Sequence, residues 1–106
     1  LSLPELLCLD ISGCINLDLS LFSFYTPKKL KWLNLELLEP HLSDLRSSTR
    51  LEILSLKSCV NLQDQDARSL KYMSKLKQLN LENCPKLTPD IIKYLSLKFT
   101  DLEISV

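Results

Sequence analysis

The chain repeats a nine-residue pattern in which leucine occupies the first, fourth and sixth places and cysteine the ninth. The stretches 51–59 (LEILSLKSC) and 76–84 (LKQLNLENC) match it at all four places, although the five residues between these places differ. Looser copies begin at Leu6, Leu30 and Phe99, so successive copies start 24, 21, 25 and 23 residues apart. A period of about 20–50 residues indicates a fold built from stacked structural units.

The fixed places are almost all apolar, and the fourth and sixth places alternate with a variable one. This alternation predicts a short strand with one buried face in every copy. A strand of three residues is unstable alone, so the copies must pair with one another and share a core. The fixed residues are Leu6, Leu9, Ile11 and Cys14; Leu30, Leu33, Leu35 and Leu38; Leu51, Leu54, Leu56 and Cys59; Leu76, Leu79, Leu81 and Cys84; and Phe99, Leu102 and Ile104.

The connections between these strands carry helix signals and are long enough for a parallel crossover. Thr88 is a candidate N-cap with Pro89 at the first helical position, and a second helix is expected to start at Asp64 or Gln65. The connection after Leu38 is broken by Pro40, so we expect only a short helix there, beginning near Ser43. The first connection, 20–30, gives only a weak helix signal. The apolar stripes of the two clear helices are Ala67, Leu70 and Met73, and Leu87, Ile91, Ile92 and Leu95.

These patterns predict an α/β solenoid with a short-stranded parallel sheet on one side and helices on the other. With 106 residues, 45% hydrophobic and 25% charged, the chain suits one domain, 1–106, of about four and a half repeats. It begins without methionine and ends on the strand-like LEISV, and neither end supplies a polar capping unit. We therefore expect it to be a piece of a longer array.

A second recurring feature follows the strands. The cysteine at the ninth place is the first residue of a Cys-x-x-Leu step at Cys14–Leu17, Cys59–Leu62 and Cys84–Leu87. With the leucine pattern, this step resembles the cysteine-containing subtype of leucine-rich repeat. The resemblance implies an intracellular, cytoplasmic protein-interaction horseshoe with its sheet on the concave side. The subtype is best known in the substrate-recognition arm of F-box ubiquitin-ligase subunits, and similar repeats occur in assembly factors and bacterial effectors. The second copy departs from the subtype with Leu38 at the ninth place.

The sequence contains little evidence for a catalytic, cofactor or metal site. His41 stands alone after Pro40, and the one glycine, Gly13, excludes a glycine-rich phosphate loop. Cys59 and Cys84 lie 25 residues apart, whereas zinc sites use close cysteine pairs, so we interpret the repeated cysteines as reduced, buried thiols that donate to turn carbonyls. Cys8 is expected to face solvent. We predict a non-enzymatic protein without cofactor or metal.

Charge argues against nucleic acid and membrane as partners. Thirteen basic residues balance thirteen acidic ones, and no apolar run is long enough for a transmembrane helix. The stretch TPKKLKW sets three lysines beside Trp32, a combination that nucleic-acid sites use, but a solvated rim explains it more simply. We predict a protein or peptide ligand instead.

The variable places define where such a ligand would bind, because alternation sends the third, fifth and seventh places outward. Acids outnumber bases there, which favours a ligand with basic groups, and Trp32 and Ile53 stand out as adjacent apolar anchors. The alternative is that Trp32 merely covers its neighbours. The predicted outward places are Cys8, Trp32, Ile53, Gln78 and Asp101; Asp10, Asn34, Ser55, Asn80 and Glu103; and Ser12, Glu36, Lys57, Glu82 and Ser105. The predicted partner-binding residues are Trp32, Asn34, Glu36, Ile53, Ser55, Lys57, Gln78, Asn80, Glu82, Asp101 and Glu103.

Overall fold

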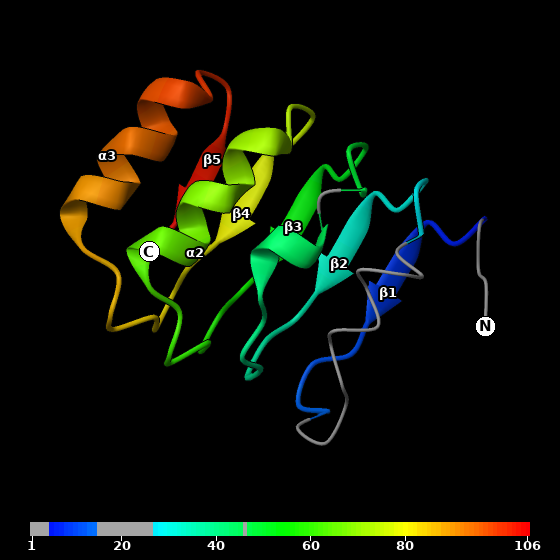
Figure 1. Cartoon of the computed structure of the whole chain (residues 1–106), viewed down its shortest axis with the longest axis horizontal. Coiled ribbons are helices and arrows are strands. Elements are labelled where there is room, and N and C mark those ends of the chain that lie inside the picture. The colour runs from blue at the N-terminus through cyan, green and yellow to red at the C-terminus, as the bar shows by residue number, and fades with distance from the viewer. Residues whose placement is uncertain (1–4, 15–26, 46) are drawn as a thin grey trace.

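The computed structural model describes residues 5–14, 27–45 and 47–106 and is an α/β structure with one open, five-stranded parallel sheet (Figure 1). The strands lie in chain order, and the helices cover one of the two sheet faces. The strands are β1 (Cys8–Asp10), β2 (Trp32–Asn34), β3 (Ile53–Ser55), β4 (Gln78–Asn80) and β5 (Glu103–Ser105). The helical segments are η2 (Leu42–Leu45), α2 (Asp64–Arg68), η3 (Ser69–Tyr72) and α3 (Pro89–Lys98).

The first four strands pair in the register that the repeat predicts. Leu33 of β2 lies opposite Leu54 of β3, which lies opposite Leu79 of β4, so the fourth places form one continuous row. Each of these leucines is at most 1% exposed. The shared leucine interior is therefore confirmed for these copies.

The predicted alignment of the last copy is wrong by two residues. Gln78 pairs with Glu103 and Leu79 with Ile104, so Ile104 takes the fourth place and the copy starts at Asp101 rather than Phe99. Its spacing from Leu76 is then 25 residues, the same as between the two preceding copies. The polar Asp101 at the first place conceals this register in the sequence.

The helices complete the core from the other side. Ala67, Leu70 and Met73 are buried, as are Ile91 and Leu95. Both predicted apolar stripes are thus confirmed, with Leu87 and Ile92 packed half-buried against the core. Burying such side chains stabilises the fold by about 1.5–3 kcal/mol each.

The helix boundaries follow the predicted signals. Thr88 is the N-cap of α3, with Pro89 at its first position, and α2 begins at Asp64. The α2 segment is short because the chain tightens into the 3-10 turns of η3. Among its described residues, the second connection holds only the 3-10 segment Leu42–Leu45, as its proline suggested. Most of the first connection lies outside the described residues.

A feature that the sequence did not reveal is a left-handed residue in the turn after each of the first four strands. The eighth place has a positive φ in all four copies, at Gly13 (73°), Leu37 (68°), Ser58 (60°) and Asn83 (56°). Glycine and asparagine suit this conformation, whereas leucine and serine do not. The fold therefore imposes this turn geometry even at Leu37 and Ser58, whose residue types disfavour a positive φ.

Candidate functional site

The helices cover one face of the sheet (Figure 1). The third and fifth places of every strand lie on the opposite face, because the fourth place between them packs into the core. We call this surface the sheet face. Its third places are Cys8, Trp32, Ile53, Gln78 and Glu103, and its fifth places are Asp10, Asn34, Ser55, Asn80 and Ser105. All ten side chains are exposed or half-buried.

Two large apolar side chains adjoin one another on this otherwise polar surface. Trp32 of β2 and Ile53 of β3 are direct partners in the parallel register, and both are half-buried. Adjacent parallel strands lie about 4.8 Å apart, so the two side chains are close neighbours. Both side chains keep part of their apolar surface open to a ligand.

A groove of about 290 Å³ opens beside Ile53. Glu36 and Glu103 contribute carboxylates to its lining, and Ile53 contributes apolar surface. The Ser55 hydroxyl donates to Glu36 Oε2 at 2.6 Å, which fixes the orientation of that carboxylate. Such a groove can hold a cationic side chain, with its aliphatic stem on Ile53 and its charged end at a carboxylate. The other lining residues are Leu54, Ser55, Gln78, Leu79, Asn80 and Ser105.

Three of the predicted surface residues at the fifth place also stabilise turns. Asn34 Oδ1 accepts the Glu36 N–H at 3.0 Å, and Asn80 Oδ1 accepts the Glu82 N–H at 2.9 Å. Asp10 Oδ1 accepts the Ser12 N–H at 3.0 Å and its hydroxyl at 2.7 Å, and these bonds hold the pKa of Asp10 below its usual value. Because these oxygens already accept hydrogen bonds within the turns, they are poor candidates for ligand contacts.

The remaining predicted residues separate into two groups. Lys57 is exposed and Glu82 half-buried at the seventh place, immediately after their strands. Asp101 lies two residues before β5 and therefore not on the strand. Glu103 moves instead into the third place beside Gln78, a position that the 25-residue spacing could have revealed.

The repeated cysteines serve the interior. Cys59 Sγ donates to the Leu35 carbonyl at 3.3 Å and Cys84 Sγ to the Leu56 carbonyl at 3.0 Å, each acceptor being the sixth place of the preceding copy. Burial raises the pKa of Cys59 to about 11 and also raises that of Cys84. Both are free, buried thiols, as predicted.

The first copy behaves differently. Cys14 is exposed, so the prediction of burial is wrong there, because the described part of the chain contains no copy before Leu6 to supply the acceptor carbonyl. Cys8 is exposed, as predicted. Within the described residues, no group of three or more His, Cys, Asp or Glu side chains is arranged to hold a metal ion.

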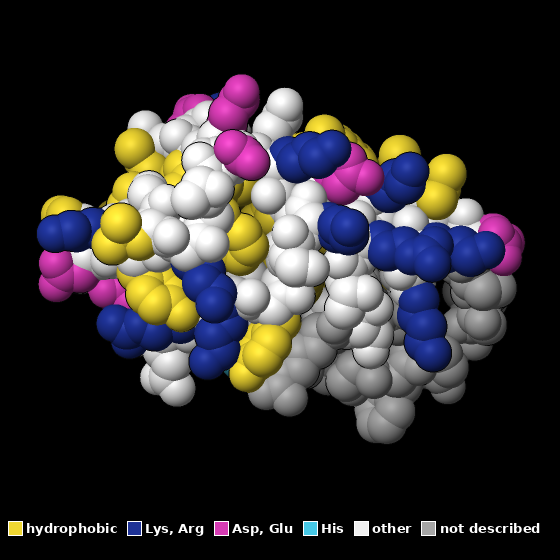
Figure 2. All heavy atoms as spheres, turned by 90° about the horizontal axis from the view of Figure 1, so that it is seen from above, with side chains coloured by type: hydrophobic (Ala, Val, Ile, Leu, Met, Phe, Trp, Pro, Cys, Tyr) yellow, Lys and Arg dark blue, Asp and Glu magenta, His cyan; other side chains and the backbone are white. Residues whose placement is uncertain are grey.

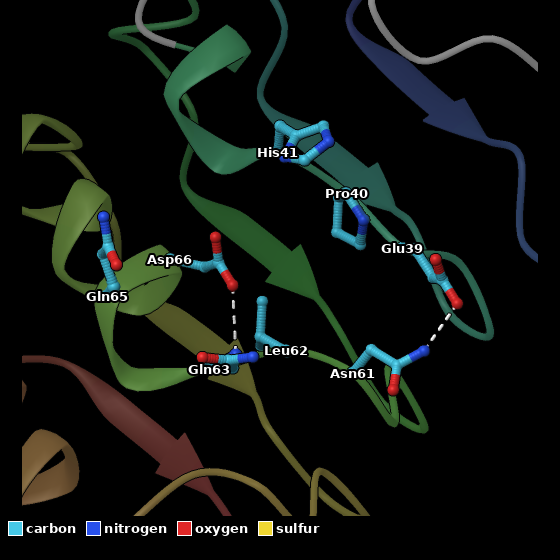
Figure 3. A pocket seen from close by; sticks show the side chains of 8 residues that line it. All are labelled: Glu39, Pro40, His41, Asn61, Leu62, Gln63, Gln65 and Asp66. Carbon is cyan, nitrogen blue, oxygen red and sulfur yellow. Dashed lines mark hydrogen bonds between the residues drawn. The ribbon is translucent and has the colours of Figure 1, made fainter.

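A second cavity, of about 370 Å³, lies where the short second connection meets the start of α2 (Figure 3). Glu39, Pro40 and His41 line it from one side, and the segment 61–66 lines it from the other. Asn61 Nδ2 donates to Glu39 Oε1 at 2.6 Å and Lys86 Nζ donates to Asn61 Oδ1 at 3.0 Å, so polar side chains of three copies are linked. His41 is exposed on its connection, as expected for a loop residue.

Two findings bear on the identity of the chain. Among the helices of the described ranges, none has the length and apolar character of a transmembrane span. The sequence gives no match to a protein-family model and no significant match to a curated protein.

Proposed function

We propose that the chain is a non-enzymatic interaction module of the leucine-rich-repeat type, which binds a protein or peptide on its sheet face. The repeat at the core places, the parallel register and the thiol bonds between copies support the repeat assignment. In this architecture the leucines stay fixed because they fill the shared interior. The residues between them vary because they meet solvent or a ligand.

The pairing of Trp32 with Ile53 is the observation that carries this proposal. A tryptophan and an isoleucine in direct register form an apolar centre, and polar side chains surround them. Binding energy at protein interfaces concentrates in such central apolar groups, with a polar rim that excludes water. The pair therefore anchors the ligand.

The chemistry of the ligand follows from the groove beside this pair. Glu36 and Glu103 border it, and the orientation of Glu36 is already fixed by Ser55. A lysine or arginine of the ligand would meet these carboxylates while its neighbours cover Trp32. The module thus selects peptides that combine an apolar residue with a basic one.

A displayed library of random peptides is a direct probe of this proposal. Selected peptides should combine apolar and basic residues, and Trp32→Ala or Ile53→Ala should weaken their binding about tenfold or more. Leu97→Ala is the matched control, because Leu97 is 74% exposed on α3, a helix on the opposite face of the sheet. Trp32 is the only tryptophan, so its fluorescence also reports occupancy of the site. Failure to select any peptide, or equal binding by all three variants, would refute the proposal.

A substrate-recognition role in ubiquitin ligation is the finer proposal that the family resemblance suggests. In this role the sheet face would bind the substrate, and other parts of the ligase assembly would bind other surfaces of the protein. Affinity capture with the full-length protein tests it. Recovery of cullin-ligase scaffolds supports this role, whereas recovery of an organelle complex would replace it with the assembly-factor role.

A further inference from the structure

The charges of this neutral chain are divided between two opposite edges of the sheet. Among the described residues, the edge where the strands begin carries eight lysines and arginines and three carboxylates, whereas the edge where the strands end carries seven carboxylates and two lysines. The first set is Lys28, Lys29, Lys31, Arg50, Lys71, Lys75, Lys77 and Lys98, against Glu5, Glu52 and Asp101. The second is Asp10, Glu36, Glu39, Asp64, Asp66, Glu82 and Asp90, against Lys57 and Lys86. Figure 2 looks down on the strand-start edge and shows the gathered lysine and arginine side chains.

The helices explain part of this division. Each helix runs back against the strand direction, so the C-terminal ends of η3 and α3 reach the strand-start edge (Figure 1). Lys71 and Lys98 lie in the last turns of these helices, where a cation offsets the partial negative charge of the helix end. Lys71 also lies 5.2 Å from the centre of the Tyr72 ring. These two lysines therefore have roles within the fold.

The other six cations lie outside helices, in the segments that lead into β2, β3 and β4. Lys29 pairs with Glu5 at 2.9 Å and Lys77 with Glu52 at 3.3 Å. The remaining four are exposed and form no ion pair with any described residue. We call them the basic row: Lys28, Lys31, Arg50 and Lys75.

We propose that the basic row is a second docking surface, which binds an acidic segment of a protein partner. Its cations lie on three consecutive inter-strand segments, whose strands are spaced about 4.8 Å apart, and neighbouring like charges repel one another. Carboxylates of a partner would relieve that repulsion and pair with the cations one by one. This surface is independent of the proposed ligand site on the sheet face.

The same edge favours an acidic peptide over a nucleic acid. Glu5, Glu52 and Asp101 are interspersed among the cations and would repel a continuous line of phosphates. The chain as a whole has no net charge, so it lacks the long-range attraction that nucleic-acid binding uses. A peptide can place separate carboxylates opposite the unpaired cations and avoid the acids.

The test compares two triple variants that remove the same charge. Lys31→Gln, Arg50→Gln and Lys75→Gln neutralise three of the four cations of the basic row, one on each inter-strand segment, whereas Arg68→Gln, Lys86→Gln and Lys93→Gln neutralise three exposed cations elsewhere. The probe is a fluorescent 12-residue peptide rich in glutamate and aspartate, measured by anisotropy at low and physiological salt. Circular dichroism checks that both variants remain folded.

The first variant should bind the acidic peptide about tenfold more weakly than the wild type, since each exposed ion pair contributes a few-fold. The second should bind within about twofold of the wild type, and added salt should weaken all binding. Absence of wild-type binding, or an equal loss in both variants, would overturn the proposal. Tighter binding of a single-stranded 12-nucleotide DNA, or of vesicles rich in phosphatidylserine, would also overturn it.

Discussion

The second and third copies of the repeat keep the same strand register although their connections differ in length. The second copy reaches the next strand in 21 residues through a four-residue 3-10 turn, whereas the third uses 25 residues with α2 and η3. The second has Leu38 at the ninth place, and the third has Cys59 with its bond to the preceding copy. Yet β2, β3 and β4 keep one register.

This comparison separates what sets the register from what the connection adds. The register depends on the leucines at the first, fourth and sixth places, which are buried in both copies. The connection decides instead how the helix side is filled and where hollows remain, such as the cavity beside His41. A connection can therefore change without disturbing the sheet face.

The largest expected effect tests whether both copies share one core. Leu33→Ala and Leu54→Ala should each lower the free energy of unfolding by about 2–5 kcal/mol, because both side chains are fully buried and leave a cavity. Urea denaturation followed by Trp32 fluorescence measures the loss. A loss below about 1 kcal/mol at Leu33 alone would show that the second copy packs separately.

The next largest loss of stability is expected for a substitution at the ninth place. Cys59→Ala should cost about 1–2 kcal/mol at pH 7, because it removes the thiol bond to the Leu35 carbonyl, which then accepts only from the Leu38 N–H, and leaves a small cavity in the core. Cys14→Ala is the control, since Cys14 is exposed and should change stability by less than about 0.5 kcal/mol. Equal effects at both positions would contradict the structural role of Cys59.

Cys59 also predicts a pH dependence. Folding raises the thiol pKa from 9.0 to about 11, so the unfolded chain loses the proton first. The stability that the neutral thiol contributes is complete below about pH 9 and is lost as the pH rises toward 11. Denaturation at several pH values should therefore show a steeper alkaline loss in the wild type than in Cys59→Ala. Parallel curves for the two proteins would contradict the burial of this thiol.

A substitution at the eighth place of the second copy should instead stabilise the protein. Leu37 is 59% exposed and has a φ of 68°, so Leu37→Asn should raise the free energy of unfolding by about 1 kcal/mol. Asn83→Leu, at the same place of the fourth copy, should lower it by a similar amount. Thermal denaturation of the two variants compares them directly, and destabilisation by Leu37→Asn would contradict the left-handed turn.

The smallest effect concerns the link between the third and fourth copies. Asp64 accepts hydrogen bonds from the Thr88 N–H, at 2.9 Å, and from its hydroxyl, and these bonds lower the pKa of Asp64. Asp64→Asn should cost less than about 1 kcal/mol at pH 7, because the site is exposed. The wild type should lose this contribution as the pH falls through the lowered pKa. An unchanged difference between the two proteins at pH 7 and pH 3 would contradict the link.

The sequence predicted the periodic parts of the molecule well. The parallel pairing, the buried leucines and the start of α3 followed from the repeat and from Thr88 and Pro89, because core burial and capping leave local patterns. The register of the last copy escaped prediction because Asp101 breaks the pattern at its first place. The left-handed Leu37 escaped it because no residue preference favours that conformation there.

The candidate site was predictable only in outline. Alternation identified Trp32 and Ile53 as neighbours, and their pairing confirms that placement. It could not show that the Asn34 and Asn80 side chains accept turn hydrogen bonds, because those depend on the backbone path after the strand. Nor could alternation alone place Glu103 in the groove with Glu36, since that requires the register of β5, which only the 25-residue spacing indicates.

Cross-strand nuclear Overhauser effects between backbone protons test the central claim most directly, because they report strand order, direction and register together. We predict contacts of Ile53 with Trp32 and with Gln78, and of Gln78 with Glu103, in the parallel pattern. Contacts in an antiparallel pattern, or their absence between Ile53 and Gln78, would contradict the shared leucine interior and the sheet face built on it.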